Sequence, residues 1–232
     1  MKASYRDQLI TYLSQFLLER RILRFDEILK NRTEHLIVVL EDIYQSQNAS
    51  AVLRTCDCFG IQDVHIIENY HNYKINPDVA MGSDKWLNLH FHDQKAQNTI
   101  PALKKLKREG YRIVATTPHK DDINLEEFDL TKGKVALVFG SEVPGISQEV
   151  MQEADEFMKI PMYGFTESFN ISVSAAICMH HLIWDLHQSD IDWHLPFERK
   201  QDLKLDWMIK SLKKPELLIQ NFKKINPHLA SI

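Results

Sequence analysis

Hydrophobic residues along the chain fall into two alternating patterns, which predict strands separated by helices. Short apolar runs without polar interruption indicate strands buried on both faces, whereas the alternation at 86–92 indicates a strand with one exposed face. The predicted strands lie at 36–40, 64–67, 86–92, 113–116, 135–139 and 157–160. Apolar residues at steps of three and four predict helices between them, at 48–59, 95–109, 147–154 and 168–187. This succession is typical of an α/β fold with a mostly parallel sheet.

Both ends of the chain are predicted to be helical and separate from this fold. Apolar residues at helical spacing predict one helix over 4–30, and two further helices at 198–212 and 215–223 follow a linker at 188–196. We therefore divide the chain into a helical N-terminal extension at 1–32, a central domain at 33–187 and a helical C-terminal extension at 188–232.

The charge is unevenly distributed, although the formal net charge is only −4. Residues 1–32 carry +3 and residues 196–232 carry +4, so the middle of the chain carries −11. Basic ends favour an anionic partner such as RNA, although lysine and arginine also serve simply to solvate terminal helices. No apolar run reaches the 18 residues of a membrane span, and the N-terminus lacks a signal-peptide core, so we expect a cytoplasmic protein with no membrane partner.

Composition excludes several other classes of protein. With 232 residues, 44% of them apolar, the chain can form a packed core and is neither a disordered chain nor a disulfide-rich mini-protein. Its three cysteines, Cys56, Cys58 and Cys178, follow no zinc spacing, so we expect reduced and mostly buried thiols. His90 and His92 share one face of a predicted strand, but no third ligand is evident, and we predict no metal site.

Three polar segments follow predicted strands, at 46–50, 140–145 and 161–168, where a parallel sheet binds its ligands. The first contains Asn48, which suits either a helix cap or a ligand contact. Arg54 follows it and suits either a phosphate contact or a surface salt bridge.

The second and third segments follow the two apolar strands nearest the C-terminal end of the central domain. One brings Gly140, Glu142 and Gly145 into a tight loop, but it has neither the dinucleotide-binding nor the P-loop pattern. The other runs through Ser168, which suits a helix cap, into a helix lined with small residues at 172–176. Because the nucleophile elbow of hydrolases is missing, Ser168 is not expected to act as a nucleophile.

These three segments, in this order and spacing, resemble the three motifs of the SpoU/TrmH family of RNA ribose 2′-O-methyltransferases, in the SPOUT superfamily. The stretch Met81-Gly82-Ser83-Asp84-Lys85-Trp86 is also similar to that family, and the resemblance covers about residues 34–187. The basic helical extensions look most like the branch that methylates a D-loop guanosine of transfer RNA. Other branches modify ribosomal RNA or the wobble ribose of the anticodon.

The resemblance implies a parallel α/β sheet whose C-terminal part threads through a loop as a trefoil knot, and it implies a homodimer. It also implies S-adenosylmethionine as the cofactor, bound at the matching positions Thr116, Gly140, Ile160, Met162 and Phe169. Phe169 departs from the family, in which leucine is usual. The polar residues of the three motifs are all matched, by Asn48, Arg54, Glu142, Ser168 and Asn170.

The implied reaction is methyl transfer from a sulfonium to a ribose 2′-hydroxyl, which must lose its proton. Arg54 is expected to bind the adjacent phosphate and, as proposed for this family, to receive that proton. Because arginine is normally always charged, the alternative is a purely electrostatic Arg54, with water carrying the proton. Asn48 would orient Arg54, while Glu142, Ser168 and Asn170 would hold the loops and the substrate.

The basic extensions are expected to contact the phosphates of transfer RNA, and no DNA partner is expected. The predicted phosphate contacts are Arg20, Arg21, Arg24, Arg199, Lys200, Lys210, Lys213 and Lys214. The alternative is that the extension helices only pack the dimer. Two other interpretations stay open: a non-catalytic RNA-binding homologue, and a flavodoxin-like nucleotide-binding protein, which the missing phosphate-loop motif disfavours.

Overall fold

The computed structural model describes residues 3–118, 122–141 and 145–227, and the chain forms two compact units. The central unit spans Thr33–Trp193, and the terminal unit combines Met1–Arg32 with His194–Ile232. The two segments that the sequence suggested as separate extensions thus belong to one helical unit. Within the described residues, no helix is long and apolar enough to cross a membrane.

The central unit is built on a seven-stranded sheet in the order β3-β2-β1-β6-β4-β7-β5, in which neighbouring strands all pair in parallel. The strands are β1 (Leu36–Glu41), β2 (Asp63–Ile67), β3 (Asn88–His92), β4 (Arg112–Thr116), β5 (Ile123–Asn124), β6 (Val135–Phe139) and β7 (Glu156–Lys159). The predicted parallel sheet is therefore confirmed. Only the short strand β5 was not predicted, because two residues are too few to show a periodicity.

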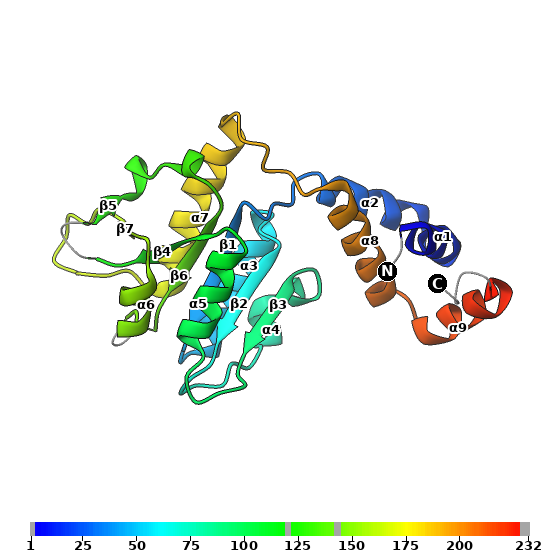
Figure 1. Cartoon of the computed structure of the whole chain (residues 1–232), viewed down its shortest axis with the longest axis horizontal. Helices are drawn as coiled ribbons and strands as arrows, with labels where there is room; N and C mark the ends of the chain where they lie inside the picture. Colours follow the sequence, from blue (N-terminus) through cyan, green and yellow to red (C-terminus); the bar gives the residue numbers. More distant parts are fainter. Residues whose placement is uncertain (1–2, 119–121, 142–144, 228–232) are drawn as a thin grey trace. The chain divides into compact units, whose positions relative to one another are not determined.

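Helices cover both faces of this sheet, which explains the uninterrupted apolar runs of its inner strands (Figure 1). On one face lie α3 (Ser46–Cys58) and α7 (Ile171–Gln188), which bury Leu36, Val38 and Leu40 of β1. On the other lie α5 (Thr99–Arg108) and α6 (Gln148–Glu153), which bury Ile37 and Val39 of the same strand. The remaining short elements are α4 (Pro77–Ala80), η1 (Ser83–Lys85), η2 (Leu125–Glu127) and η3 (Leu130–Lys132).

The terminal unit consists of four helices in its described part: α1 (Ala3–Ser14), α2 (Glu19–Leu29), α8 (Phe197–Ser211) and α9 (Pro215–Ile225). The prediction of one continuous helix over 4–30 is wrong. The chain turns at residues 15–17 through hydrogen bonds to the third preceding residue, and Leu18 is extended. This break lets α1 and α2 each pack against α8, so that Leu13 and Phe25 are both buried.

Some of the positive charge in the terminal unit holds that unit together. Arg6 is 2% exposed and forms ion pairs with Glu198 and Asp202 of α8, at 2.7 and 3.2 Å. The guanidinium of Arg32 lies 5.4 Å from the ring centroid of the buried Trp207, a cation–π contact. Basic residues in the terminal segments therefore divide into structural ones and ones that face solvent.

Two helix starts differ from those predicted. Helix α3 begins at Ser46, so Asn48 lies within its first turn and does not cap it, and the predicted loop at 46–50 is wrong. Helix α7 begins at Ile171, and Asn170 caps it by accepting a hydrogen bond from Ser172 N at 2.9 Å. The prediction of Ser168 as the cap is therefore wrong. For α7, serine and asparagine have similar cap preferences, which do not fix the position. For α3, the N-cap is Gln45, which makes no side-chain cap hydrogen bond and is not a typical cap residue, so no signal in the sequence pointed to it.

The three cysteines are free thiols. Cys56 and Cys178 are buried, as expected for most of them, whereas Cys58 is exposed. Burial raises the pKa of Cys178 to about 12, which makes it an inert core residue.

Candidate functional site

Three of the predicted cofactor residues lie at the carboxyl ends of adjacent strands. In the sheet, β4 lies between β6 and β7, so that Thr116 at the end of β4 has Gly140 after β6 on one side and Ile160 after β7 on the other. Thr116 Oγ1 donates a hydrogen bond to Val138 O at 2.9 Å. Thr117 N donates to Met158 O at 3.0 Å. The three strand ends are thereby fixed relative to one another.

The first and third sequence motifs are in direct contact. Asn170 Nδ2 donates a hydrogen bond to Asn48 Oδ1 at 3.2 Å, across 122 residues of sequence. Asn48 is only 8% exposed, and its Nδ2 donates to Gln45 Oε1 at 3.2 Å. Because Asn170 also caps α7, this one pair joins the start of α3 to the start of α7.

The second motif is held by a close backbone approach at Gly140. A Cβ atom added there would lie 2.3 Å from Gly145 O and 2.4 Å from Ile146 N, so only glycine fits. Gly145 itself has φ +89, in the region that favours glycine. The end of β6 therefore lies directly against the backbone of Gly145 and Ile146, and this contact fixes the second motif at the end of its strand. Glu142 lies outside the described residues.

The third motif leaves β7 as an exposed loop. Met162 is half-buried, whereas Ser168 is exposed and Phe169 is 43% exposed. Ser168 forms no hydrogen bond with the residues that the structure describes. The structure thus places Ser168, Phe169 and Met162 on the segment between β7 and Asn170, and no side-chain hydrogen bond joins them to the other predicted site residues that it describes.

Arg54 projects from the side of α3 that faces solvent. It forms no ion pair or hydrogen bond with any residue in the described ranges. The described residues therefore offer no partner for the surface salt bridge that was the alternative role of Arg54. Its guanidinium is free to contact an anion such as a phosphate.

Glu41 is a buried residue of this edge that the sequence analysis did not single out. It ends β1, is 2% exposed, and accepts hydrogen bonds from Thr99 Oγ1 at 2.6 Å and from Ser147 Oγ at 2.7 Å. Ser147 N also donates to its other oxygen at 3.1 Å. Because Ser147 caps α6, Glu41 fixes the far end of the segment that starts at Gly140. The one feature of the sequence that could have pointed to Glu41 is its position, a carboxylate directly after a predicted buried strand.

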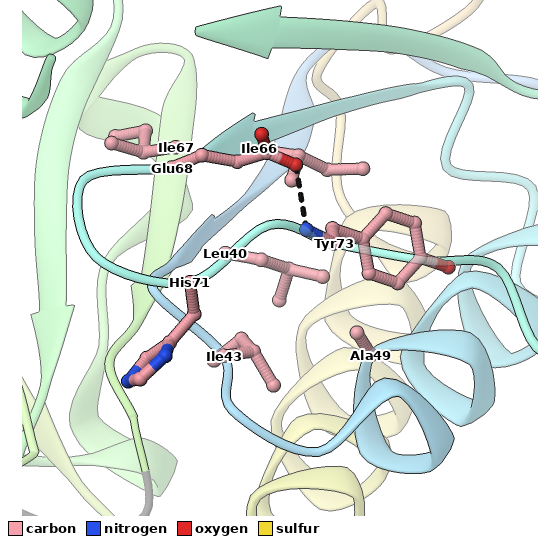
Figure 2. Close-up of a pocket in the computed structure, with 8 residues that line it drawn as sticks. All are labelled: Leu40, Ile43, Ala49, Ile66, Ile67, Glu68, His71 and Tyr73. Atoms are coloured by element: carbon pink, nitrogen blue, oxygen red, sulfur yellow. Dashed lines mark hydrogen bonds between the residues drawn. The ribbon is translucent and has the colours of Figure 1, made fainter. Parts of the chain in front are cut away.

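A small pocket lies next to these residues, at the carboxyl ends of β1 and β2 (Figure 2). Its lining residues are Leu40, Ile43, Ala49, Ile66, Ile67, Glu68, His71 and Tyr73. Tyr73 N donates a hydrogen bond to Glu68 Oε1 at 2.7 Å, and this bond closes the segment over the pocket. Three of the predicted cofactor residues, Thr116, Gly140 and Ile160, lie instead at the ends of β4, β6 and β7.

The histidines of β2 and β3 form a stacked group on the face of the sheet that α5 covers. His65 Nδ1 lies 2.9 Å from His92 Nε2, and the His65 and His90 rings stack at 4.4 Å between centroids. Burial, followed by the nearby His90 and His92, lowers the pKa of His65 to about 3. Among the described residues, no group of three or more histidine, cysteine, aspartate or glutamate side chains is arranged to hold a metal ion.

The predicted phosphate contacts of the terminal unit differ in their surroundings. Four are exposed and form no ion pair with the described part of the chain: Arg20, Arg21, Lys213 and Lys214. Arg24 is paired with Glu27 at 2.8 Å, and Lys210 with Asp206 at 2.6 Å. Arg199 and Lys200 are half-buried. The first four are therefore the best placed to meet a phosphate.

The parallel sheet, with helices on both faces and the first and third motifs in contact at its carboxyl edge, defines an α/β protein. The chain matches the model of the SpoU rRNA Methylase family over residues 35–180, more than half of its length, and therefore belongs to that family. It is 45% identical, over 198 residues, to a Borreliella burgdorferi protein named tRNA (guanosine(18)-2′-O)-methyltransferase. That match covers 85% of this chain and 88% of the relative. Family membership overturns the flavodoxin-like alternative.

Solved structures give the same assignment. The A. aeolicus TrmH/SpoU tRNA modifying enzyme is 31% identical, with a TM-score of 0.75 over 84% of this chain and 98% of that one. The SpoU methyltransferase AviRb from Streptomyces viridochromogenes, solved in complex with the cofactor AdoMet, shares the fold. It has a TM-score of 0.57 and 19% identity over 68% of this chain and 60% of that one.

Proposed function

We propose that this protein transfers a methyl group from S-adenosylmethionine to a ribose 2′-hydroxyl of RNA, specifically guanosine 18 of transfer RNA, as the name of its B. burgdorferi relative states for that protein. The observation that carries the proposal is the hydrogen bond from Asn170 to Asn48. It unites two motifs of a methyltransferase family at the sheet edge where the predicted cofactor residues end their strands.

The residues that would hold the cofactor are Thr116, Gly140, Ile160, Met162 and Phe169. The close approach of Gly140 to Gly145 supports this, because it fixes the second motif at the end of β6. When bound, S-adenosylmethionine supplies a methyl group already activated on a sulfonium. The task of the protein is therefore to align the ribose oxygen and to accommodate its proton.

Arg54 binds the phosphate next to the target ribose and stabilises negative charge that develops on the 2′ oxygen. Its exposed position without a described ion-pair partner supports this role. If the Arg54 guanidinium is neutral in the complex, it accepts the hydroxyl proton; if Arg54 stays charged, its role is purely electrostatic and water carries the proton away. Asn48, held by Gln45 and Asn170, sets the position of the helix that carries Arg54. Glu142, Ser168 and Asn170 hold the loops and the substrate.

We also propose that the protein is a homodimer with a trefoil knot, as the family resemblance implies. One face of α7 supports the dimer. Val173 is 44% exposed and Trp184 is 61% exposed on a helix whose opposite face is core, so a second copy would remove large apolar side chains from water.

In this proposal the RNA is held through the terminal unit as well as the site. Arg20, Arg21, Lys213 and Lys214 supply exposed positive charge for phosphates. DNA is not expected as a substrate, because it lacks the 2′-hydroxyl that receives the methyl group. A transfer RNA substrate also agrees with the cytoplasmic location expected from the sequence.

The test is to incubate the purified protein with isotopically labelled S-adenosylmethionine and unmodified transfer RNA, and to map the label by nuclease digestion and mass spectrometry. The expected product is 2′-O-methylguanosine at position 18. Label on a base contradicts the proposal. If the purified protein binds transfer RNA but transfers no methyl group, the proposal is wrong and the protein is a non-catalytic RNA-binding homologue.

A further inference from the structure

We propose that Tyr44, Tyr70 and His71 form a surface that stacks on unpaired bases of the RNA substrate, an inference that rests on the proposed function. These three residues are called the aromatic surface below. Tyr44 lies in the loop between β1 and α3, and Tyr70 and His71 lie in the segment after β2. Both loops leave the carboxyl edge of the sheet, the edge that carries the site.

The side chains of the aromatic surface are exposed to solvent. Tyr44 is 71% exposed and Tyr70 is 78% exposed, although large aromatic side chains usually lie in the core. The Tyr44 and His71 rings meet edge to face, with centroids 5.1 Å apart and planes at 71°. His71 and Tyr73 both line the pocket, and their side chains point in different directions from the same segment (Figure 2).

Asp42 fixes the two loops to each other. Its carboxylate oxygen Oδ1 accepts hydrogen bonds from Asn69 N at 2.8 Å, Tyr70 N at 2.9 Å and His71 N at 3.3 Å. Asp42 has φ +48, a left-handed conformation in which aspartate is enriched among the residues other than glycine. The backbone beneath the rings is therefore organised before any ligand arrives.

The two loops that carry the aromatic surface are tied to the helix of the first motif. Tyr44 directly precedes Gln45, whose side chain accepts a hydrogen bond from Asn48. The segment that carries Tyr70 is also tied to α3, because Asn76 N donates to Ser50 Oγ at 2.9 Å. Nucleotides that flank a ribose held beside Asn48 would meet these rings first.

An RNA base is the partner that this chemistry fits. A ribose 2′-hydroxyl is most accessible in a loop, where the bases are unstacked and need new faces to stack on. Aromatic side chains provide such faces for any base and lose little entropy when they are already held. Lys74, in the same segment, is exposed and offers a positive charge for a neighbouring phosphate.

The test compares Tyr44→Ala and Tyr70→Ala with Tyr44→Phe and Tyr70→Phe in the full chain, and measures the Kd for unmodified transfer RNA by fluorescence anisotropy. We expect each alanine variant to raise the Kd by about 5-fold to 100-fold, the effect of losing one stacked base. The phenylalanine variants, which keep the ring, should stay within about 2-fold of the wild type. The matched control is Phe197→Ala, which removes another exposed ring, at the start of α8 in the terminal unit.

Affinity for S-adenosylmethionine by calorimetry and the thermal unfolding midpoint should be unchanged in the tyrosine variants. Unchanged RNA affinity in Tyr44→Ala and Tyr70→Ala overturns the inference while leaving the proposed function intact. The inference is also overturned if Tyr44→Ala or Tyr70→Ala converts a dimer of the protein into monomers, because the rings would then contact a second copy of the chain and not an RNA base. Failure of the wild-type protein to bind or methylate any transfer RNA overturns the proposed function and this inference together.

Discussion

Asn170 donates a hydrogen bond to Asn48 over 3.2 Å, and through this contact two helices that begin 125 residues apart are joined at their first turns. Asn170 also caps α7, and Asn48 also donates to Gln45. Each asparagine therefore uses both ends of its amide, so that neither can turn without breaking a second hydrogen bond. The pair fixes the helix that carries Arg54 against the loop that follows β7.

If this pair acts as one unit, its two members will not contribute independently to catalysis. We expect Asn48→Ala and Asn170→Ala each to lower kcat/KM, and the double variant to lose less than the two single losses combined. Residues in contact typically show a coupling of about 0.5–3 kcal/mol. Steady-state kinetics of the four proteins in the cycle gives that coupling directly. Strictly additive losses would show that the hydrogen bond has no role in positioning Arg54.

Arg54 is predicted to act on the reaction rather than on the cofactor. Arg54→Ala should lower kcat by at least about 100-fold, the scale of a lost acid–base or charge-stabilising group, and leave the Kd for S-adenosylmethionine near that of the wild type. Arg108→Ala, which removes an exposed arginine from α5, is the control. Near-normal turnover by Arg54→Ala would remove Arg54 from the mechanism.

Gly140 provides the sharpest test of the cofactor loop. A methyl group in Gly140→Ala would collide with the backbone of Gly145, and forcing apart such a contact typically costs about 1–3 kcal/mol. Calorimetry should therefore show at least a 5-fold weaker affinity for S-adenosylmethionine, since about 1.4 kcal/mol corresponds to tenfold. Gly164→Ala is the matched control, because its nearest neighbouring atom would lie 4.0 Å away. Equal binding by both variants would place the cofactor elsewhere.

The buried His65 predicts that acid destabilises the protein. Its pKa is about 3 in the folded chain, so from its ordinary value of 6.5 down to about 3 only the unfolded chain binds a proton there. The free energy of unfolding should therefore fall as the pH drops through this range, with a slope of up to about 1.4 kcal/mol per pH unit from His65 alone. The burial of His35 and His92, which lowers the pKa of each, acts in the same direction.

Urea unfolding at a series of pH values measures this slope. His65→Gln removes the titrating group and should flatten the slope between pH 6.5 and pH 3, whereas His180→Gln, at an exposed position of α7, should retain it. An identical slope in the wild type and in His65→Gln would show that His65 is not the source of the acid sensitivity.

The apolar runs of the sequence predicted most of the sheet because these strands are buried on both faces. In β1 and β6 every residue is buried, and such a run has few other structures available to it. The break at residues 15–18 was not predictable in the same way, since it contains neither glycine nor proline and depends on packing against α8. Propensity alone does not report such tertiary constraints.

The sequence predicted only part of the site. The spacing of Asn48, Gly140 and Asn170 suggested three loops at one edge, but it placed Asn48 and Ser168 at helix caps that Gln45 and Asn170 occupy. The sequence did not indicate a role for Glu41, because its partner Ser147 lies 106 residues away and no local pattern relates the two. Contacts of this kind depend on strand order, which the sequence pattern does not specify.

The most direct test of the central claim uses two synthetic transfer RNAs that differ only in the 2′ group of guanosine 18, the position named for the B. burgdorferi relative. With labelled S-adenosylmethionine, we expect methyl transfer to the RNA with a 2′-hydroxyl at that nucleotide. The 2′-deoxy RNA should accept no methyl group while competing for binding. Equal transfer to both RNAs would place the methyl group elsewhere and contradict the account.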